Sequence, residues 1–221
     1  MLEIETVFDA TKTPAVRGFI HQPVGARRAA VVLTHGAGSN CNAPLLVALS
    51  EALAQAGVAS LRCDLPYRQR HPHGPPRGTA AEDQAGLRRA VNILKEMVPG
   101  PIFMGGMSYG GRQATILAGS EPELVNGLMI LSYPLHPPGK PDQLRIAHLS
   151  KIRMPALFIS GAKDKFGSPE EMRAAIALIP ANVSFVSIEG AGHDLGFGRG
   201  SRQHNTTEHI VQTFEELFLE V

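Results

Sequence analysis

Short runs of β-branched and other apolar residues alternate with longer segments of helical periodicity along almost the whole chain of 221 residues. This alternation is typical of a mostly parallel sheet with helices on both faces, because parallel strands need long crossover connections. We predict eight strands, at residues 2–8, 15–21, 29–34, 58–63, 101–105, 127–131, 156–160 and 183–188. We predict the main helices at residues 43–56, 80–97, 109–119, 169–178 and 202–219. The chain is therefore expected to form one α/β domain over residues 1–221.

The connections between these elements refine the α/β prediction. The turn-prone residues 9–14 separate the first two strands, which we expect to form an antiparallel hairpin at one edge of the sheet. Asn42 and Ser168 are suited to cap the helices that follow them, each of which has a proline in its first turn. Residues 132–154 contain a proline-rich run and a short helical stretch at 142–149. Because this segment is too short for a folded cap, we predict a sheet without a cap domain.

The composition argues against several classes of partner. Lys and Arg total 21 against 20 for Asp and Glu, so the formal net charge of +1 gives no general attraction to nucleic acid or to an anionic membrane. Tyr is scarce and Trp absent, which leaves few platforms for stacked bases. No apolar run approaches the ~18 residues that span a bilayer, no early stretch resembles a signal peptide, and Cys41 and Cys63 are too few for a disulfide framework. We expect a cytoplasmic protein with a small-molecule partner; the oligomeric state stays open.

A glycine-rich segment at residues 106–111, Gly-Met-Ser-Tyr-Gly-Gly, joins a predicted strand to a predicted helix. It contains the pattern Gly-x-Ser-x-Gly, in which a sharp turn strains the serine backbone and exposes the hydroxyl. Gly106 and Gly110 lack the Cβ atoms that would collide in such a turn. In a glycine-rich chain the pattern alone is also compatible with an ordinary turn, so other residues must decide. The candidate nucleophile is Ser108.

A nucleophilic serine needs a base, and a carboxylate that orients the base, at the carboxyl ends of neighbouring strands. Asp164 follows the seventh predicted strand, and His193 follows the eighth in a loop of small residues. Asp164 could instead belong to a turn or cap before the next helix, and Asp194 competes with it as the partner of His193. Because adjacent side chains usually diverge, we favour Asp164. The chain order Ser108, Asp164, His193 predicts an acyl-transfer triad.

Backbone donors for a developing negative charge are the fourth element of such a site. Residues 33–39, Leu-Thr-His-Gly-Ala-Gly-Ser, place a glycine-rich turn directly after the third predicted strand. We expect the N–H groups of Ala37 and Tyr109 to form an oxyanion hole, because Tyr109 follows the nucleophile at a helix N-terminus.

Taken together, residues 35–38 (His-Gly-Ala-Gly), the segment 106–111, Lys163-Asp164 and Gly192-His193 resemble the α/β-hydrolase superfamily over essentially the whole chain. The strings at residues 64–68, 133–140 and 161–167 are similar to its dienelactone-hydrolase-like branch, which includes predicted hydrolases of the testis-expressed and non-specific-lethal complex subunit type. The resemblance implies the α/β-hydrolase fold and serine-type acyl hydrolysis. True dienelactone hydrolases carry a cysteine nucleophile where this chain has Ser108, so their substrate is not carried over.

A basic loop follows the fourth predicted strand. Its Arg68 and Arg70 could recognise an anionic substrate, since guanidinium groups pair with carboxylate or phosphate; the alternative is a solvated surface loop. His71 and His73 lack a nearby cysteine or carboxylate to complete a ligand set, so we predict no metal site. Met107 is expected to form part of the pocket wall beside the nucleophile, although burial at the helix start explains it equally well.

These observations predict a serine hydrolase that acts on a carboxylic ester or related small acyl substrate through an acyl-enzyme, with no cofactor. Two other functions stay open at this point. One is a catalytically idle interaction module that keeps the fold. The other is an acyltransferase that uses the same triad with an alcohol or amine as acceptor.

Overall fold

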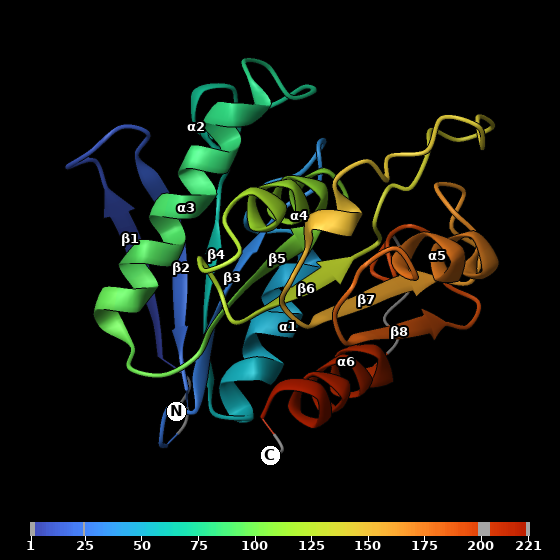
Figure 1. Cartoon of the computed structure of the whole chain (residues 1–221). Coiled ribbons are helices and arrows are strands. Elements are labelled where there is room, and N and C mark those ends of the chain that lie inside the picture. Colours follow the sequence, from blue (N-terminus) through green and yellow to red (C-terminus); the bar gives the residue numbers. More distant parts are fainter. Residues whose placement is uncertain (1–2, 24, 199–203, 220–221) are drawn as a thin grey trace.

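The computed structural model describes residues 3–23, 25–198 and 204–219 (Figure 1). The described residues form one eight-stranded sheet in the order β1-β2-β4-β3-β5-β6-β7-β8. The strands are β1 (Glu3–Asp9), β2 (Val16–Gln22), β3 (Ala29–Thr34), β4 (Val58–Cys63), β5 (Ile102–Met107), β6 (Gly127–Leu131), β7 (Ala156–Gly161) and β8 (Val183–Ile188). The helices are α1 (Pro44–Gln55), α2 (Pro66–Arg70), α3 (Ala80–Met97), α4 (Tyr109–Ser120), the 3₁₀ turn η1 (Leu149–Lys151), α5 (Pro169–Ile176) and α6 (His204–Phe218).

The first two strands form the predicted hairpin. β1 pairs antiparallel with β2 at the edge of the sheet, and β2 pairs antiparallel with β4. From β4 onward the neighbouring strands are parallel. The prediction of a mostly parallel eight-stranded sheet is therefore confirmed, and its carboxyl ends meet at one edge, where loops from different strands come together.

Apolar side chains at successive strand positions point to opposite faces of the sheet and form two separate buried clusters. In β3, Val32 belongs to a cluster that includes Leu87 of α3, whereas Leu33 belongs to a cluster on the other face. That second cluster includes Leu49 of α1 and Phe214 of α6. Because strand side chains alternate between faces, a fully apolar strand needs helices on both sides. Helices α3, α4 and α5 cover one face and α1 and α6 the other (Figure 1), as predicted.

The segment between β6 and β7 contains no folded cap among the residues that the structure describes, in agreement with the prediction. The prediction of a helical stretch at 142–149 is wrong, because residues 142–148 form no helix and only the single 3₁₀ turn η1 follows them. The prolines on its amino-terminal side lack backbone N–H donors, which disfavours a longer helix. Predicted residues 2 and 202–203 lie outside the described residues.

The helix caps were predicted with mixed success. Ser168 caps α5 as expected, with its hydroxyl accepting from Glu171 N–H and the Glu171 carboxylate accepting from Ser168 N–H. Asn42 does not cap α1, whose N-cap is Ala43 without a side-chain hydrogen bond. Instead the Asn42 side-chain oxygen accepts from Nη1 of Arg62, at 2.6 Å. The Asn42 side chain therefore binds Arg62, which is distant in sequence, instead of the N-terminus of α1.

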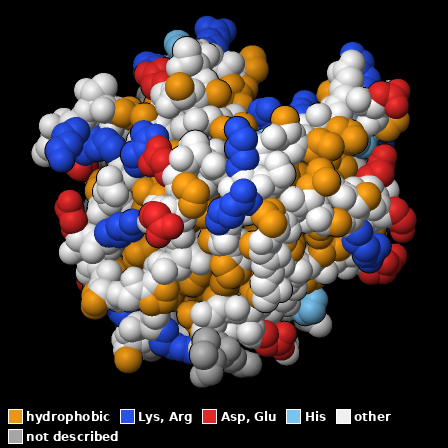
Figure 2. Space-filling view, in the orientation of Figure 1, with side chains coloured by type: hydrophobic (Ala, Val, Ile, Leu, Met, Phe, Trp, Pro, Cys, Tyr) orange, Lys and Arg blue, Asp and Glu red, His pale blue; other side chains and the backbone are white. Residues whose placement is uncertain are grey.

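Basic, acidic and apolar side chains are interspersed on the face shown in Figure 2, consistent with a net charge of +1. Within the described ranges, no helix has the length and apolar character required to cross a membrane.

Candidate active site

Ser108 lies at the tight turn between β5 and α4. Its backbone φ is 51°, in the left-handed region that side-chain-bearing residues rarely adopt. A Cβ at Gly106 would lie 2.4 Å from the Thr34 carbonyl oxygen, and a Cβ at Gly110 would lie 2.6 Å from the His35 carbonyl oxygen. Only glycine allows this close approach of β3 to the turn. The segment thus has the strained geometry that the Gly-x-Ser-x-Gly pattern predicts.

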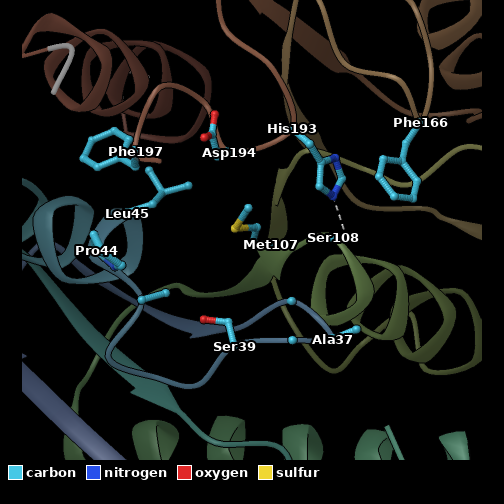
Figure 3. Close-up of a pocket in the computed structure, with 13 residues that line it drawn as sticks. Ala37, Ser39, Pro44, Leu45, Met107, Ser108, Phe166, His193, Asp194 and Phe197 are labelled. Carbon is cyan, nitrogen blue, oxygen red and sulfur yellow. Dashed lines mark hydrogen bonds between the residues drawn. The ribbon is translucent and has the colours of Figure 1, made fainter. Parts of the chain in front are cut away.

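Three side chains predicted to act together form a continuous hydrogen-bonded chain. His193 Nε2 is 2.9 Å from Ser108 Oγ, and His193 Nδ1 is 2.8 Å from Asp164 Oδ2. Figure 3 shows the imidazole pointing toward Ser108. The Asp164 carboxylate is almost completely buried and can accept a hydrogen bond from His193 Nδ1–H, which leaves Nε2 as the acceptor that faces the Ser108 hydroxyl.

Backbone contacts fix the loops that carry the acid and the histidine. Lys163 N–H donates to the Ala191 carbonyl at 2.8 Å, which ties the loop after β7 to the loop after β8. A Cβ at Gly161 would lie 2.2 Å from the Gly192 carbonyl oxygen, so this junction also requires glycine. Asp194 turns away from His193, because its Oδ1 accepts from Gly196 N–H at 3.0 Å. The structure therefore brings Asp164, rather than Asp194, to His193.

Phe166 contacts both Asp164 and His193. Its backbone N–H donates to Asp164 Oδ1 at 2.9 Å, which leaves Oδ2 for the histidine. Its ring lies against the imidazole, with centroids 4.2 Å apart and planes inclined by 30°. Phe166 was not predicted as a site residue, and its position two residues after Asp164 is the one sequence signal that points to it.

A cavity of about 350 Å³ opens over Ser108 and His193. Much of its wall is apolar, as Figure 3 shows, and the apolar side chains are Pro44, Leu45, Met107, Phe166 and Phe197. Met107 therefore lies in the pocket wall, where it was expected. An apolar wall next to Ser108 suits an uncharged organic group.

Ala37 and Tyr109 come from two loops that meet near Ser108. Ala37 lines the cavity in the loop after β3, and Tyr109 is the first residue of α4. The Gly36 carbonyl lies 2.9 Å from His35 Nδ1, and in the planar trans peptide it points in the opposite direction to the Ala37 N–H. The Ala37 carbonyl in turn accepts from the Tyr67 hydroxyl at 2.9 Å. Both peptides that flank Ala37 are thereby held in place.

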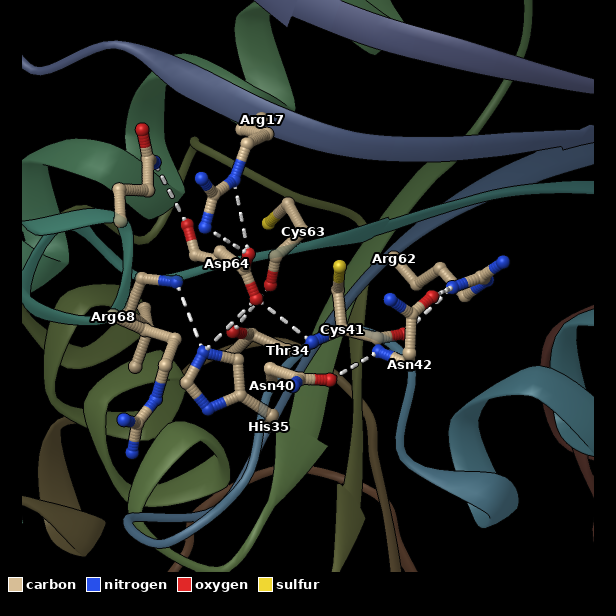
Figure 4. A network of polar contacts seen from close by, with 12 residues as sticks. Arg17, Thr34, His35, Asn40, Cys41, Asn42, Arg62, Cys63, Asp64 and Arg68 are labelled. Atoms are coloured by element: carbon tan, nitrogen blue, oxygen red, sulfur yellow. Dashed lines mark hydrogen bonds and ion pairs between the residues drawn. The ribbon is translucent and has the colours of Figure 1, made fainter. Parts of the chain in front are cut away.

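A buried polar network lies behind this loop (Figure 4). The Asp64 carboxylate accepts from Cys41 N–H at 2.8 Å, and His35 Nε2 accepts from Leu65 N–H at 3.1 Å. Nε2 is therefore unprotonated and Nδ1 donates to the Gly36 carbonyl. Burial lowers the pKa of His35, which favours this neutral form. His35 supports the loop and is separate from the hydrogen-bonded chain of Ser108.

The structure departs from the prediction for Arg68 and Arg70. Arg68 is only 2% exposed in the short helix α2, and its guanidinium donates to the carbonyls of Ala37, His71 and Gly74. Arg70 forms an ion pair with Glu82. Neither arginine lines the cavity over Ser108. Both guanidinium groups are bound by other groups of the protein, so Arg68 and Arg70 are not part of the candidate substrate site.

The described part of the chain contains no group of three or more His, Cys, Asp or Glu side chains that could together bind a metal ion.

The fold is that of an α/β hydrolase. Residues 27–219 match the model of a family described as an alpha/beta hydrolase domain, and the chain belongs to that family.

Solved structures give the same picture of the fold. A dienelactone hydrolase from Anabaena variabilis is 23% identical, with a TM-score of 0.73 over 98% of this chain and 97% of that one. Est1E from Butyrivibrio proteoclasticus is 18% identical, with a TM-score of 0.76 over 97% and 99% of the two chains. The esterase domain of a Rhodothermus marinus protein is 19% identical, with a TM-score of 0.70 over 97% of each.

Proposed function

We propose that this protein is a single-domain serine hydrolase that cleaves carboxylic esters through an acyl-enzyme. The observation that carries the proposal is the chain of hydrogen bonds from Asp164 through His193 to Ser108 Oγ at the base of an apolar cavity. A serine hydroxyl is a weak nucleophile until an adjacent base accepts its proton. The distances of 2.9 Å from His193 Nε2 to Ser108 Oγ and 2.8 Å from His193 Nδ1 to Asp164 Oδ2 support these roles for His193 and Asp164.

In the first half-reaction, Ser108 Oγ attacks the ester carbonyl carbon while His193 Nε2 accepts the hydroxyl proton. The carbonyl oxygen becomes an oxyanion, which the N–H groups of Ala37 and Tyr109 stabilise. The intermediate then collapses, the bond from carbon to the alcohol oxygen breaks, and His193 returns the proton to the leaving alcohol. Asp164 stabilises the imidazolium that exists between these two proton transfers.

In the second half-reaction, His193 removes a proton from water, and the resulting hydroxide attacks the acyl carbon. Collapse of the second tetrahedral intermediate breaks the bond to Ser108 Oγ, and the serine recovers its proton from His193. The products are a carboxylic acid and an alcohol, and the enzyme returns to its starting state.

The cavity supports an uncharged acyl group of modest size. Leu45, Met107 and Phe197 offer apolar contacts, and a volume of about 350 Å³ is at the small end for ligand pockets. Among the related folds, Est1E has been solved with ferulic acid bound. We therefore propose short aliphatic and simple aromatic acyl esters as the substrate class, and panels of both are the appropriate test.

Replacement of Ser108 by Ala tests the proposed function directly. We expect turnover of p-nitrophenyl acetate to fall by at least about 10³-fold, because the acyl-enzyme can no longer form. Replacement of Ser150, an exposed serine that does not line the cavity, by Ala is the matched control and should change turnover by less than about threefold. Equal turnover by the wild type and the Ser108 variant would refute the proposal.

A further inference from the structure

Asp83 is a buried carboxylate that the proposed reaction does not use. It lies in the first turn of α3 and is only 2% exposed. Burial raises its pKa, and among the described residues its hydrogen bonds come from neutral groups. Burying a carboxylate without a bonded cation is costly, so an apolar residue would serve packing alone at least as well.

The two oxygens of Asp83 bind two different elements of the site. Asp83 Oδ2 accepts from the Tyr109 hydroxyl at 2.8 Å, and Asp83 Oδ1 accepts from Tyr67 N–H at 3.3 Å. The rings of Tyr67 and Tyr109 also meet edge to face, with centroids 5.8 Å apart and planes at 88°. One carboxylate therefore joins the start of α2 to the start of α4.

Each of these tyrosines controls one of the two oxyanion donors. Tyr109 itself carries one donor on its backbone. The Tyr67 hydroxyl donates to the Ala37 carbonyl at 2.9 Å and lies 3.4 Å from the Gly36 carbonyl, so it holds the two peptides that determine the direction of the Ala37 N–H. Tyr67 is fully buried and cannot easily take another position.

The approach of α3 to α2 depends on Gly86, one turn after Asp83. A Cβ at Gly86 would lie 2.6 Å from Cδ of Pro66, a ring atom that cannot swing away. The glycine lets α3 lie directly against the start of α2, where Asp83 can reach Tyr67 N–H. The charged groups nearest to Asp83 in sequence and space, Glu82 and Arg70, are paired with each other.

We propose that Asp83 is a positioning residue that aligns the two halves of the oxyanion hole, the Ala37 N–H through Tyr67 and the Tyr109 N–H through the Tyr109 side chain. The inference rests on the proposed function, because it concerns the same acyl-transfer site. Oxyanion donors act by being aimed at the transition-state oxygen before the reaction. A small displacement of either peptide should therefore lower the rate of the chemical step more than it weakens the binding of the substrate.

The test is Asp83→Asn, which keeps the shape but replaces one acceptor oxygen by an NH₂ group. We expect kcat for p-nitrophenyl butyrate to fall about tenfold while KM changes less than twofold. The inhibition constant of phenylboronic acid, which forms a tetrahedral adduct with a serine, should rise by about the same factor as kcat falls. Glu82→Gln, on the adjacent and more exposed residue, is the matched control and should leave all three values within twofold.

Tyr109→Phe provides a second route, because it removes the phenol that donates to Asp83 and keeps the ring and the backbone N–H. Its kcat should fall by a similar factor, and combining it with Asp83→Asn should cost less than the product of the two separate losses. If Asp83→Asn does not fold, Tyr109→Phe is judged by the same kcat, KM and boronate criteria.

Values of kcat and boronate affinity within twofold of wild type would overturn the positioning role, and so would a loss confined to KM or to thermal stability. These outcomes leave the proposed function standing as long as Ser108→Ala is inactive. Full activity of Ser108→Ala would overturn both proposals.

Discussion

The imidazole of His193 lies against the ring of Phe166, with 4.2 Å between centroids, while the Phe166 N–H binds the carboxylate that orients the same imidazole. A side chain and a backbone group of one residue therefore contact both His193 and Asp164.

Replacing Phe166 by Leu should lower kcat/KM about 2- to 12-fold. The substitution removes the ring contact, worth about 0.5–1.5 kcal/mol, but keeps the backbone donor to Asp164. Phe197→Leu removes a ring from another part of the same cavity and serves as the control. Steady-state kinetics with p-nitrophenyl butyrate would measure both; equal losses in the two variants would show that the ring acts only as cavity wall.

The two neighbouring carboxylates should differ sharply in their effect on rate. Asp164→Asn should reduce kcat by about 10³- to 10⁴-fold, because the amide no longer selects the Nδ1-protonated imidazole. Asp194→Asn should reduce it by less than about threefold, since Asp194 binds Gly196 N–H and not the histidine. Comparable losses in both variants would contradict the role given to Asp164.

Acid should destabilise the fold through His21, which is fully buried in β2 and accepts from Arg62 Nε at 2.8 Å. Burial, followed by the charge of Arg62, lowers its pKa from 6.5 to about 4. Because the pKa is lower in the folded state, the stabilisation is complete above pH 6.5 and is lost as the pH falls toward 4. We expect this group to reduce the free energy of unfolding by about 2–3 kcal/mol between pH 7 and pH 4.

Urea unfolding of His21→Gln across this pH range would measure the effect. The variant should show a flatter pH dependence than wild type, whereas His73→Gln, at an exposed position, should follow wild type. An unchanged pH dependence in His21→Gln would argue against the lowered pKa.

The thiol of Cys41 should be unreactive in the native protein. Cys41 is 2% exposed, and burial together with Asp64 raises its pKa to about 12. Burial also raises the pKa of Cys63. At pH 8 we expect reaction with Ellman's reagent at least about 100-fold slower than that of free cysteine, because thiolate is the reacting species. Unfolding in guanidinium should release both thiols, and fast labelling of the native protein would contradict this account.

The sheet and the positions of Ser108, Asp164 and His193 could be predicted because their signals are local. Strand and helix periodicity, the glycines of the turn at Ser108 and the small residues before His193 each report on a few adjacent positions. The tertiary partners of long polar side chains could not be predicted in this way. Arg68 was expected at the substrate because it is charged, but three backbone carbonyls surround it in the fold.

Asp83 was not predicted as a site residue, although its position in α3 signals that its carboxylate is buried. It stands four and seven residues before Leu87 and Ala90, on the stripe of α3 that packs into the core. A carboxylate on a buried stripe indicates a polar partner, but the sequence does not say that the partners are Tyr67 and Tyr109. That information depends on how α2, α3 and α4 meet in space.

The most direct test of the central claim, that Ser108 is a nucleophile activated by His193, is labelling with a fluorophosphonate probe followed by mass spectrometry of the peptides. The account predicts a single adduct on Ser108 in the wild type, no adduct in Ser108→Ala and labelling at least about 100-fold slower in His193→Ala. A wild-type protein that remains unlabelled, or that is labelled at Ser108 equally fast without His193, would contradict it.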